Sequence, residues 1–334
     1  MDELERDIDA IAAESQFSGA VRIDRGGDVV VERAYGLARR DTEAPNTPAT
    51  QFGTASALKG KTALAVMCLV EDGVLALDTT ARSVLGDDLP LIADDVTVRH
   101  LLAHRSGIGD YLDEDGEEYE TTAYIMPVPV HTLLGPEDYV PILDGHPTKF
   151  AAGSEFAYCN GGFLVLALIA ERASGTPYHD LVRQRVFEPA GLDDTAFLRS
   201  DELPGRAAHG HLFADGPRTN VLHLPVRGTG DGGHYTTVRD MRAFWTALFD
   251  GRIVAKERLA EMVTPISDVH ELWHYGLGFW LVPGKPGVAL EGHDAGVSFR
   301  SLHDPETDTT CTVVSNWTDG AWPLARELAQ RLFR

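Results

Sequence analysis

Apolar residues follow two different periods along this chain, and the change of period predicts its elements. Residues 17–40 hold two runs rich in β-branched residues that turn at Gly26-Gly27, which predicts a β-hairpin. Strand-like runs return near the C-terminus at hairpin spacing, over residues 275–282, 288–293, 297–304 and 309–316. Strands are therefore expected at both ends of the chain.

Between these strands the apolar residues indicate helices. Residues 56–72 form a long apolar run, rich in Ala, Leu and Met, that stops at Gly73, and this length favours a buried helix over a strand. A second helix is expected at 97–107, where Thr97 can cap the first turn and Gly107 can end the helix. Further helices are predicted at 4–14, near 136–143, and at 161–175, 178–191, 236–251, 256–263 and 322–333.

This arrangement predicts an α+β fold in which both termini build one antiparallel sheet flanked by helices. We expect residues 1–80 and 231–334 to form this discontinuous sheet domain, and residues 81–230 to form an inserted, mainly helical domain. The stretch from 108 to 160 is rich in Gly, Pro, Asp and Glu, which favours long loops.

The composition supports a large packed protein and argues against several functions. Of the 334 residues, 43% are hydrophobic, which is enough for a substantial core. The 51 acidic residues against 29 basic ones give a formal charge of −22, and this charge repels phosphate backbones, so nucleic-acid binding is not expected. No secretory signal is recognised at the N-terminus, and no run approaches the roughly 20 apolar residues of a membrane helix.

The cysteine pattern indicates a reduced compartment. Cys68, Cys159 and Cys311 are an odd number at wide spacing, which argues against a disulfide framework and against a zinc knuckle. We therefore expect a cytoplasmic protein without membrane contact. The oligomeric state stays open.

The first candidate for chemistry is the run Ser56-Ala57-Leu58-Lys59. Residues three apart on a helix share a face, so the Ser56 hydroxyl and the Lys59 amine can reach hydrogen-bonding distance. Burial in an apolar helix lowers the pKa of an amine and lets it take the serine proton. At the start of that helix, the Ser56 N–H can also bind an oxyanion. Because S-x-x-K is a common pattern, a capping serine and a surface lysine are the alternative.

The second candidate is the pair Tyr158 and Asn160, just before the helix expected at 161–175. A phenol near a serine can pass the proton to a leaving group, and an amide side chain can orient both partners. Taken alone, these are ordinary capping and packing residues.

The third candidate is the run G-H-D-A-G at residues 292–296, between two predicted strands. Small residues there allow a substrate to lie along the strand edge. The Gly296 N–H is the expected second oxyanion donor, with His293 beside it. A tight strand connection with a solvated histidine is the alternative.

Together, the order and spacing of the three motifs resemble the class C β-lactamase and penicillin-binding-protein superfamily, which includes family VIII carboxylesterases and D-amino-acid peptidases. The stretches VTVRHLLAHRSGIGDY, GDGGHYTTVRDM and YGLGFWLV are similar to stretches typical of these hydrolases, and the resemblance spans about residues 15–320. It implies a β-lactamase/transpeptidase-like fold with the site between a sheet domain and a helical domain.

The resemblance also implies a role for each matched residue. Ser56 would be the nucleophile, Lys59 the general base or its proton partner, Tyr158 the acid–base relay, and Asn160 the positioning amide. His293 would replace the third-motif lysine of the superfamily. Neither a metal nor an organic cofactor is expected.

The third motif departs from the superfamily's pattern. Asp294 and Ala295 stand where Gly or Thr followed by Gly is usual. We expect the Ala295 methyl group to narrow the cleft and the Asp294 carboxylate to lie close to His293. The lysine that would recognise a substrate carboxylate is absent, which argues against a true β-lactamase or a cell-wall peptidase.

Two other short patterns are set aside. Residues 270–274 match the H-E-x-x-H pattern of zinc proteases, but Pro265 before them and Gly276 after them leave no room for the helix that this chemistry needs. Residues 60–62 resemble the end of a phosphate-binding loop, but Ala55 stands where its first glycine is required.

The leading hypothesis is hydrolysis of a small ester or amide through an acyl-Ser56 intermediate. The expected partner is a small-molecule ester, amide or peptide, with a small ester favoured over derivatives of D-amino acids. A non-catalytic binding or regulatory protein on the same scaffold is the rival hypothesis, motivated by Asp294 and Ala295. Acidic residues 113–120 are expected to line the mouth of the site and to favour neutral or cationic substrates.

Overall fold

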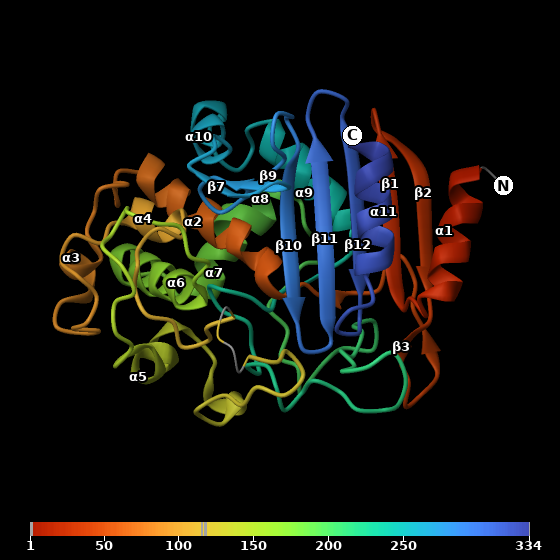
Figure 1. The fold of residues 1–334 in the computed structure, drawn as a ribbon, viewed down its shortest axis with the longest axis horizontal. Helices are drawn as coiled ribbons and strands as arrows, with labels where there is room; N and C mark the ends of the chain where they lie inside the picture. Colours follow the sequence, from red (N-terminus) through yellow and green to blue (C-terminus); the bar gives the residue numbers. More distant parts are fainter. Residues whose placement is uncertain (1–2, 115, 117–118, 334) are drawn as a thin grey trace.

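An eight-stranded antiparallel sheet joins the two ends of the chain (Figure 1). The computed structural model describes residues 3–114, 116 and 119–333. The strand order is β2-β1-β12-β11-β10-β9-β8-β7. These strands are β1 (Gly19–Arg25), β2 (Asp28–Tyr35), β7 (Ser267–His270), β8 (Trp273–Tyr275), β9 (Trp280–Leu281), β10 (Val288–Asp294), β11 (Val297–Asp304) and β12 (Thr309–Ser315). The expected antiparallel sheet built from both termini is confirmed.

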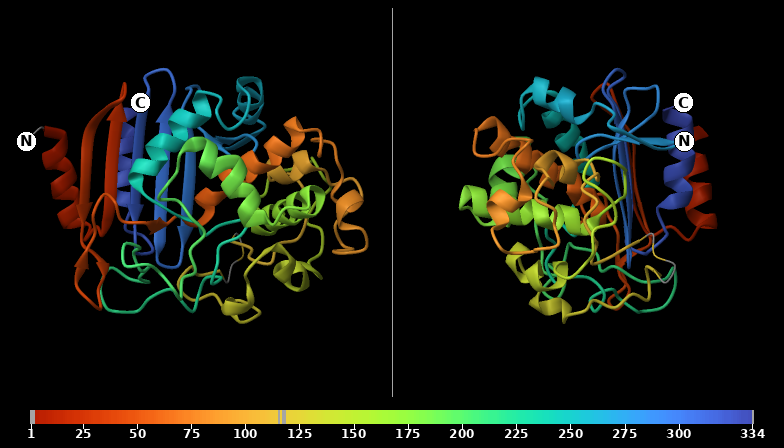
Figure 2. Two further views of the ribbon diagram at one scale, coloured as in Figure 1. Left: turned by 180° about the vertical axis from the view of Figure 1, so that it is seen from behind. Right: turned by 60° about the vertical axis from the view of Figure 1, so that its left-hand side comes forward.

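Two amphipathic helices cover one face of the sheet, on the right in the right-hand view of Figure 2. They are α1 (Glu3–Glu14) and α11 (Trp322–Leu332). Each buries one apolar stripe and leaves its charged residues in water, as the helical period requires. The apolar layer beneath them includes Ile8, Phe17, Val21, Ile23, Leu302, Val313, Leu324 and Leu328.

The other helices lie on the opposite face of the sheet and beyond its β7 edge (Figures 1 and 2). They are α2 (Lys59–Glu71), α3 (Ala81–Leu85), α4 (Val98–Leu102), α5 (Val140–Leu143), α6 (Asn160–Ser174), α7 (Tyr178–Val182), α8 (Glu188–Ala190), α9 (Val238–Phe249) and α10 (Lys256–Met262). In α2 every residue from 59 to 69 is buried, and in α6 every residue from 160 to 170. Helices that are apolar on all sides form the centre of a core.

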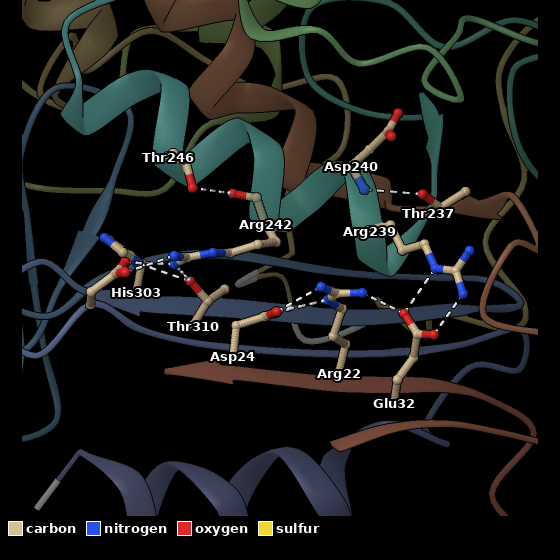
Figure 3. A network of polar contacts seen from close by, with 11 residues as sticks. Arg22, Asp24, Glu32, Thr237, Arg239, Asp240, Arg242, Thr246, His303 and Thr310 are labelled. Carbon is tan, nitrogen blue, oxygen red and sulfur yellow. Dashed lines mark hydrogen bonds and ion pairs between the residues drawn. The ribbon is translucent and has the colours of Figure 1, made fainter. Parts of the chain in front are cut away.

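Polar contacts hold α9 against the outer strands of the sheet (Figure 3). The Arg22 guanidinium on β1 donates to Asp24 Oδ1 at 2.7 Å and to Glu32 on β2. The Glu32 carboxylate also accepts from Arg239 of α9, at 2.9 Å from Nε. Asp24 is almost fully buried, so its charge depends on this arginine contact.

Two predicted elements differ in extent from the observed ones. The strand predicted over 275–282 is interrupted between β8 and β9, because residues 276–279 form a turn in which the Gly276 N–H donates to the Phe279 carbonyl at 3.0 Å and Gly278 has a φ of +85°. The helix predicted over 97–107 ends at residue 102, since His104 has a φ of +54° and turns the chain.

The division into two domains at residues 80 and 230 stays a prediction. Most elements between these limits are helical, while β6 (Tyr235–Thr236) pairs with β5 (Phe52–Gly53) outside them. Among residues 3–114, 116 and 119–333, no helix is both long and apolar enough to cross a bilayer.

A fully buried lysine lies in the core beneath the sheet. Lys61 on α2 has no exposed surface, and its Nζ lies 3.7 Å from Met241 Sδ and 4.3 Å from the centre of the Phe244 ring. Burial lowers the pKa of this amine from 10.5 to about 7, and the charge of Asp240 opposes the shift. Because the unfolded chain binds more protons than the folded one between these pH values, the free energy of unfolding must rise with pH there.

We therefore expect Lys61→Met to stabilise the protein at pH 7 or below by up to roughly 5 kcal/mol, the free energy that corresponds to the pKa shift. The gain should shrink towards pH 10.5. Chemical denaturation from pH 6 to pH 10 measures both effects. Lys285→Met, at an exposed lysine, is the control and should change little. A less stable Lys61→Met variant, or wild-type stability that does not change with pH, would contradict this account.

Candidate active site

Ser56 lies in a tight turn where the chain enters α2. Residues 55–58 form a 3₁₀ turn, so Ser56 precedes the α-helix instead of opening it as expected. Ala55 has a φ of +45°, which is rare for a residue with a side chain and is typical of functional turns. The Ser56 N–H belongs to the first turn, where no acceptor within the helix is available.

Lys59 is buried directly beside this serine. Its side chain is 2% exposed, and its Nζ donates to Ser56 Oγ at 2.9 Å, Asn160 Oδ1 at 2.7 Å and the Asp231 carbonyl at 2.7 Å. Burial lowers the pKa of the Lys59 amine, although the charges of nearby carboxylates, Asp231 first, oppose the shift. An amine whose neutral form is favoured can accept the serine proton.

Tyr158 lies on the other side of the serine hydroxyl. Its phenol shares a hydrogen bond with Ser56, and Lys59 Nζ lies 4.9 Å from the centre of its ring. The ring stacks on Trp280 and contacts His104. Burial raises the pKa of the Tyr158 phenol well above its usual value and lowers the pKa of the Lys59 amine. The phenol therefore holds its proton more tightly than it would in water, and the amine holds its proton less tightly.

Asn160 connects α6 to the lysine. It is the first residue of α6, and its N–H donates to Asp110 Oδ2 at 2.6 Å while the next N–H, of Gly161, donates to Asp110 Oδ1 at 2.8 Å. Its side-chain Oδ1 accepts from Lys59, and its Nδ2 donates to Glu114 Oε1 at 2.6 Å. Sequence reasoning missed Asp110, because a loop without apolar periodicity gives no signal of where its acids lie, whereas Glu114 belongs to the acidic segment 113–120 that was expected to line the mouth of the site.

His293 lines a groove beside Ser56 and also contacts the carboxylate of Asp319. It lies near the end of β10 and, with Ser56 and Tyr158, lines one groove. Its Nε2 lies 3.1 Å from Asp319 Oδ1, on the side of the sheet covered by α11.

Gly296 does not lie where the sequence predicted. Its N–H donates to Thr318 Oγ1 at 2.9 Å and is therefore occupied within the protein. Residues 295 and 296 form the two-residue turn between β10 and β11, with a φ of +75° at Gly296, so Gly296 leaves the strand edge. The expectation that its N–H holds an oxyanion is wrong for this geometry. The glycine that approaches the serine is Gly292, where an added Cβ would lie 3.0 Å from Ser56 N.

The two departures in the third motif also have different consequences from those expected. Ala295 is completely buried in the turn, so its methyl group does not narrow the cleft. The Asp294 carboxylate accepts from the Tyr124 hydroxyl at 3.0 Å and from the Ala295 N–H at 2.8 Å. Its side chain lines a cavity in front of Ser56, whereas His293 lines the groove on the other side.

Two hollows meet at Ser56. The inner cavity, of about 770 Å³ including its open mouth, has a largely apolar wall formed by Met126, Leu198, Leu224, Pro225, Val226, Tyr235 and Val297. The outer groove, of about 570 Å³ including the open solvent at its mouth, is lined by Ser56, Glu114, Tyr158, Trp280, Glu291, Gly292 and His293. An apolar group bound in one and a polar group in the other would place the bond between them at the serine.

Three carboxyl groups, of Glu114, Asp231 and Asp294, line the inner cavity, and no lysine or arginine lines it within the described residues. Burial raises the pKa of Asp231 to about 6 and that of Asp294 to about 7. The Tyr111 hydroxyl donates to Asp231 Oδ2 at 2.6 Å. Within the acidic segment 113–120, residues 115, 117 and 118 lie outside the described residues.

The zinc-protease pattern at 270–274 lies in the β7–β8 hairpin. His270 ends β7 and His274 lies in β8, so the two imidazoles do not share a helix face. In the described part of the chain, no group of three or more His, Cys, Asp or Glu side chains is arranged to hold a metal ion.

Comparison with known proteins gives consistent matches over the whole chain. The sequence profile of the family described as Beta-lactamase matches residues 4–333. A solved structure of a penicillin binding protein from Bacillus halodurans is 32% identical, with a TM-score of 0.91, and the match covers 97% of this chain and 100% of that one.

Two further matches differ in their described activities. Esterase EstB of Burkholderia gladioli is 34% identical over 214 residues, covering 59% of this chain and 52% of the esterase. The D-amino acid amidase from Ochrobactrum anthropi SV3, solved with L-phenylalanine amide, is 25% identical with a TM-score of 0.78, covering 95% of this chain and 92% of the amidase. The chain spans 63%, 62% and 52% of the length of the first three curated relatives it matches.

The Asp110 side chain should contribute to stability because it accepts two backbone N–H groups at the start of α6, although burial raises the pKa of its carboxyl group. In Asp110→Asn one of these donors would face an amide NH₂, and we expect a loss of about 2 kcal/mol in the free energy of unfolding. Urea denaturation measures it. Asp113→Asn in the same loop removes only an exposed ion pair with Lys149 and should cost less than about 1 kcal/mol. Equal losses in both variants would refute this capping role.

Proposed function

Because this chain belongs to the Beta-lactamase family, we propose that it is a serine hydrolase that cleaves small esters or amides through an acyl-Ser56 intermediate. One observation carries the proposal: the buried Lys59 Nζ lies 2.9 Å from Ser56 Oγ. A capping serine with a surface lysine, the alternative reading of S-x-x-K, does not fit a lysine that is 2% exposed.

In the proposed acylation step, neutral Lys59 takes the Ser56 proton while Oγ attacks the substrate carbonyl carbon. The Tyr158 phenol donates its proton to the leaving group and recovers one from the Lys59 ammonium. Asn160 holds the lysine amine through its Oδ1 and thereby fixes the distance to the serine. Each proton movement needs only groups that are in contact or one hydrogen bond apart.

Two backbone N–H groups are proposed to hold the oxyanion. The first is that of Ser56, in the opening turn of the helix. For the second, the strand register is informative: Asp294 pairs with Val297 across a two-residue turn, so this pair exchanges hydrogen bonds. In this register we expect the N–H of the preceding residue, His293, to point away from β11, and an added Cβ on the neighbouring Gly292 would lie 3.0 Å from Ser56 N. The His293 N–H replaces that of Gly296 as the proposed donor.

The substrate is proposed to be a small ester, with amides and peptides of D-amino acids as the second possibility. The match to esterase EstB favours an ester and the match to the D-amino acid amidase favours an amide. Carboxyl groups around the inner cavity, and the absence of a third-motif lysine, disfavour the carboxylate of a penicillin. A non-catalytic binding protein is disfavoured because the contacts of Lys59 are those that catalysis requires.

Ser56→Ala should lower turnover of p-nitrophenyl acetate by about 10³-fold or more, since the nucleophile is lost. A fluorophosphonate probe should label the wild-type protein on Ser56, as read by peptide mass spectrometry, and should leave the variant unlabelled. Ser154→Ala, at an exposed serine, is the matched control. Full activity in Ser56→Ala, or a label on another residue, would end the proposal.

The carboxyl groups of the inner cavity should select substrates by charge. Of two matched esters, the one with a cationic acyl group should be hydrolysed with about tenfold higher kcat/KM than the anionic one at pH 8 and low salt, a difference of about 1.4 kcal/mol. Because the pKa values of Asp231 and Asp294 are raised to about 6 and 7, these groups become neutral as the pH falls, and the preference should shrink below pH 7.

Asp294→Asn should reduce this preference, and Asp87→Asn, at an exposed site, should leave it unchanged. Added salt should weaken it as well. Equal rates for the cationic and anionic esters at every salt concentration would contradict the assignment.

A further inference from the structure

The proposed acyl-enzyme must be released by water, and a water molecule needs a base to become a nucleophile. The proposed acylation step leaves Lys59 neutral again and Tyr158 protonated, but Lys59 lines neither of the two hollows through which water would reach the acyl group. A further base beside Ser56 would complete the reaction, and this inference rests on the proposed function.

Glu114 borders both hollows that meet at the nucleophile. Among the carboxyl-bearing residues that the structure describes, it alone lines the inner cavity and the outer groove together with Ser56. An acyl group in the inner cavity and a water entering through the outer groove would therefore both lie beside this side chain.

A hydrogen-bonded chain fixes Glu114 relative to the serine. Its Oε1 accepts from Asn160 Nδ2 at 2.6 Å, Asn160 Oδ1 accepts from Lys59 Nζ at 2.7 Å, and Lys59 Nζ donates to Ser56 Oγ at 2.9 Å. The other carboxylate oxygen, Oε2, has no hydrogen-bond partner within residues 3–114, 116 and 119–333. One oxygen thus positions the group, and the second is left to bind a water molecule.

The charges around Glu114 favour a carboxylate with useful basicity. Packing around the carboxyl group raises its pKa although the residue stays exposed to water, the charge of Lys59 and the hydrogen bond from Asn160 lower it, and the charge of Asp110 raises it. Asp231 and Asp294 also face it across the inner cavity. A carboxylate with a raised pKa is a stronger base than one in water.

The other carboxylates near the serine are less suited to this role. Glu291 borders the outer groove alone and accepts from Arg300 Nε at 2.6 Å, which stabilises its charge. Asp231 and Asp294 border the inner cavity alone, each bound by a tyrosine hydroxyl, on the side where the acyl group would lie.

We propose that Glu114 is the general base that activates water for hydrolysis of the acyl-Ser56 intermediate. In this step the Glu114 carboxylate takes one proton from water, and the hydroxide oxygen forms a bond to the acyl carbonyl carbon. The tetrahedral intermediate then breaks its bond to Ser56 Oγ. The departing oxygen takes the proton that Glu114 holds, which regenerates the serine hydroxyl and the carboxylate and releases the carboxylic acid.

Glu114→Gln tests this role because glutamine keeps the acceptor for Asn160 but cannot take a proton. With p-nitrophenyl acetate we expect the initial burst of p-nitrophenol to persist at close to the wild-type rate. Steady-state kcat should fall about 10²-fold or more, with a parallel fall in KM. Mass spectrometry of the acid-quenched variant should find acetylated Ser56 accumulating. Hydroxylamine, which needs no base to attack, should restore release.

Glu257→Gln is the matched control, since Glu257 is an exposed glutamate that lines neither hollow. It should behave as wild type. If Glu114→Gln lowers the burst rate and kcat equally without accumulating acetyl-Ser56, Glu114 is a structural residue and the inference fails. Unchanged turnover also overturns it. If Ser56 is acetylated in neither protein, the proposed function itself fails.

Discussion

The buried amine of Lys59 is the interaction on which the rest of the site depends. All three of its acceptors are uncharged: a hydroxyl, an amide oxygen and a backbone carbonyl. Asp231 offers its carbonyl to the amine while its carboxylate binds Tyr111. A direct ion pair would raise the pKa of the amine and leave it protonated. Neutral acceptors hold the amine in place and leave its proton exchangeable, which is the property that an activated serine requires.

The fold supplies this geometry by bringing helix α2 unusually close to strand β10. A side chain on Gly60 would overlap Leu290, and one on Gly292 would overlap the Thr54 carbonyl. The left-handed conformation of Ala55 then turns the chain so that the serine follows directly. Backbone strain of this kind persists only where the surrounding packing is well determined. Here the packing comes from a helix that is buried along most of its length and from the central strands of the sheet.

Features that depend on residues close together in the sequence could be predicted from it, and features that depend on the path of distant segments could not. The Ser56–Lys59 contact depends on one helical turn, whose geometry is the same in every protein, so local spacing was enough to predict it. The antiparallel sheet was predictable because strand patterns occur at both ends of the chain. Gly296 was misplaced because the register of a hairpin depends on its turn, and a shift of one or two residues moves every N–H along the edge. Asp110 could not be found, since its position depends on the path of an irregular loop, and Glu114 could be predicted only as part of the acidic segment 113–120 at the mouth of the site.

The pairing of β1 with β12 has a consequence for how the protein is made. Val21 and Val313 are neighbours in the sheet although nearly the whole polypeptide separates them. The N-terminal hairpin therefore leaves the ribosome long before its central partner strand has been synthesised. Contacts of such high sequence separation form slowly and leave strand edges open in the interim. The sheet cannot form completely until these later strands have been synthesised. Strand β10, which lies against Ser56, is one of them.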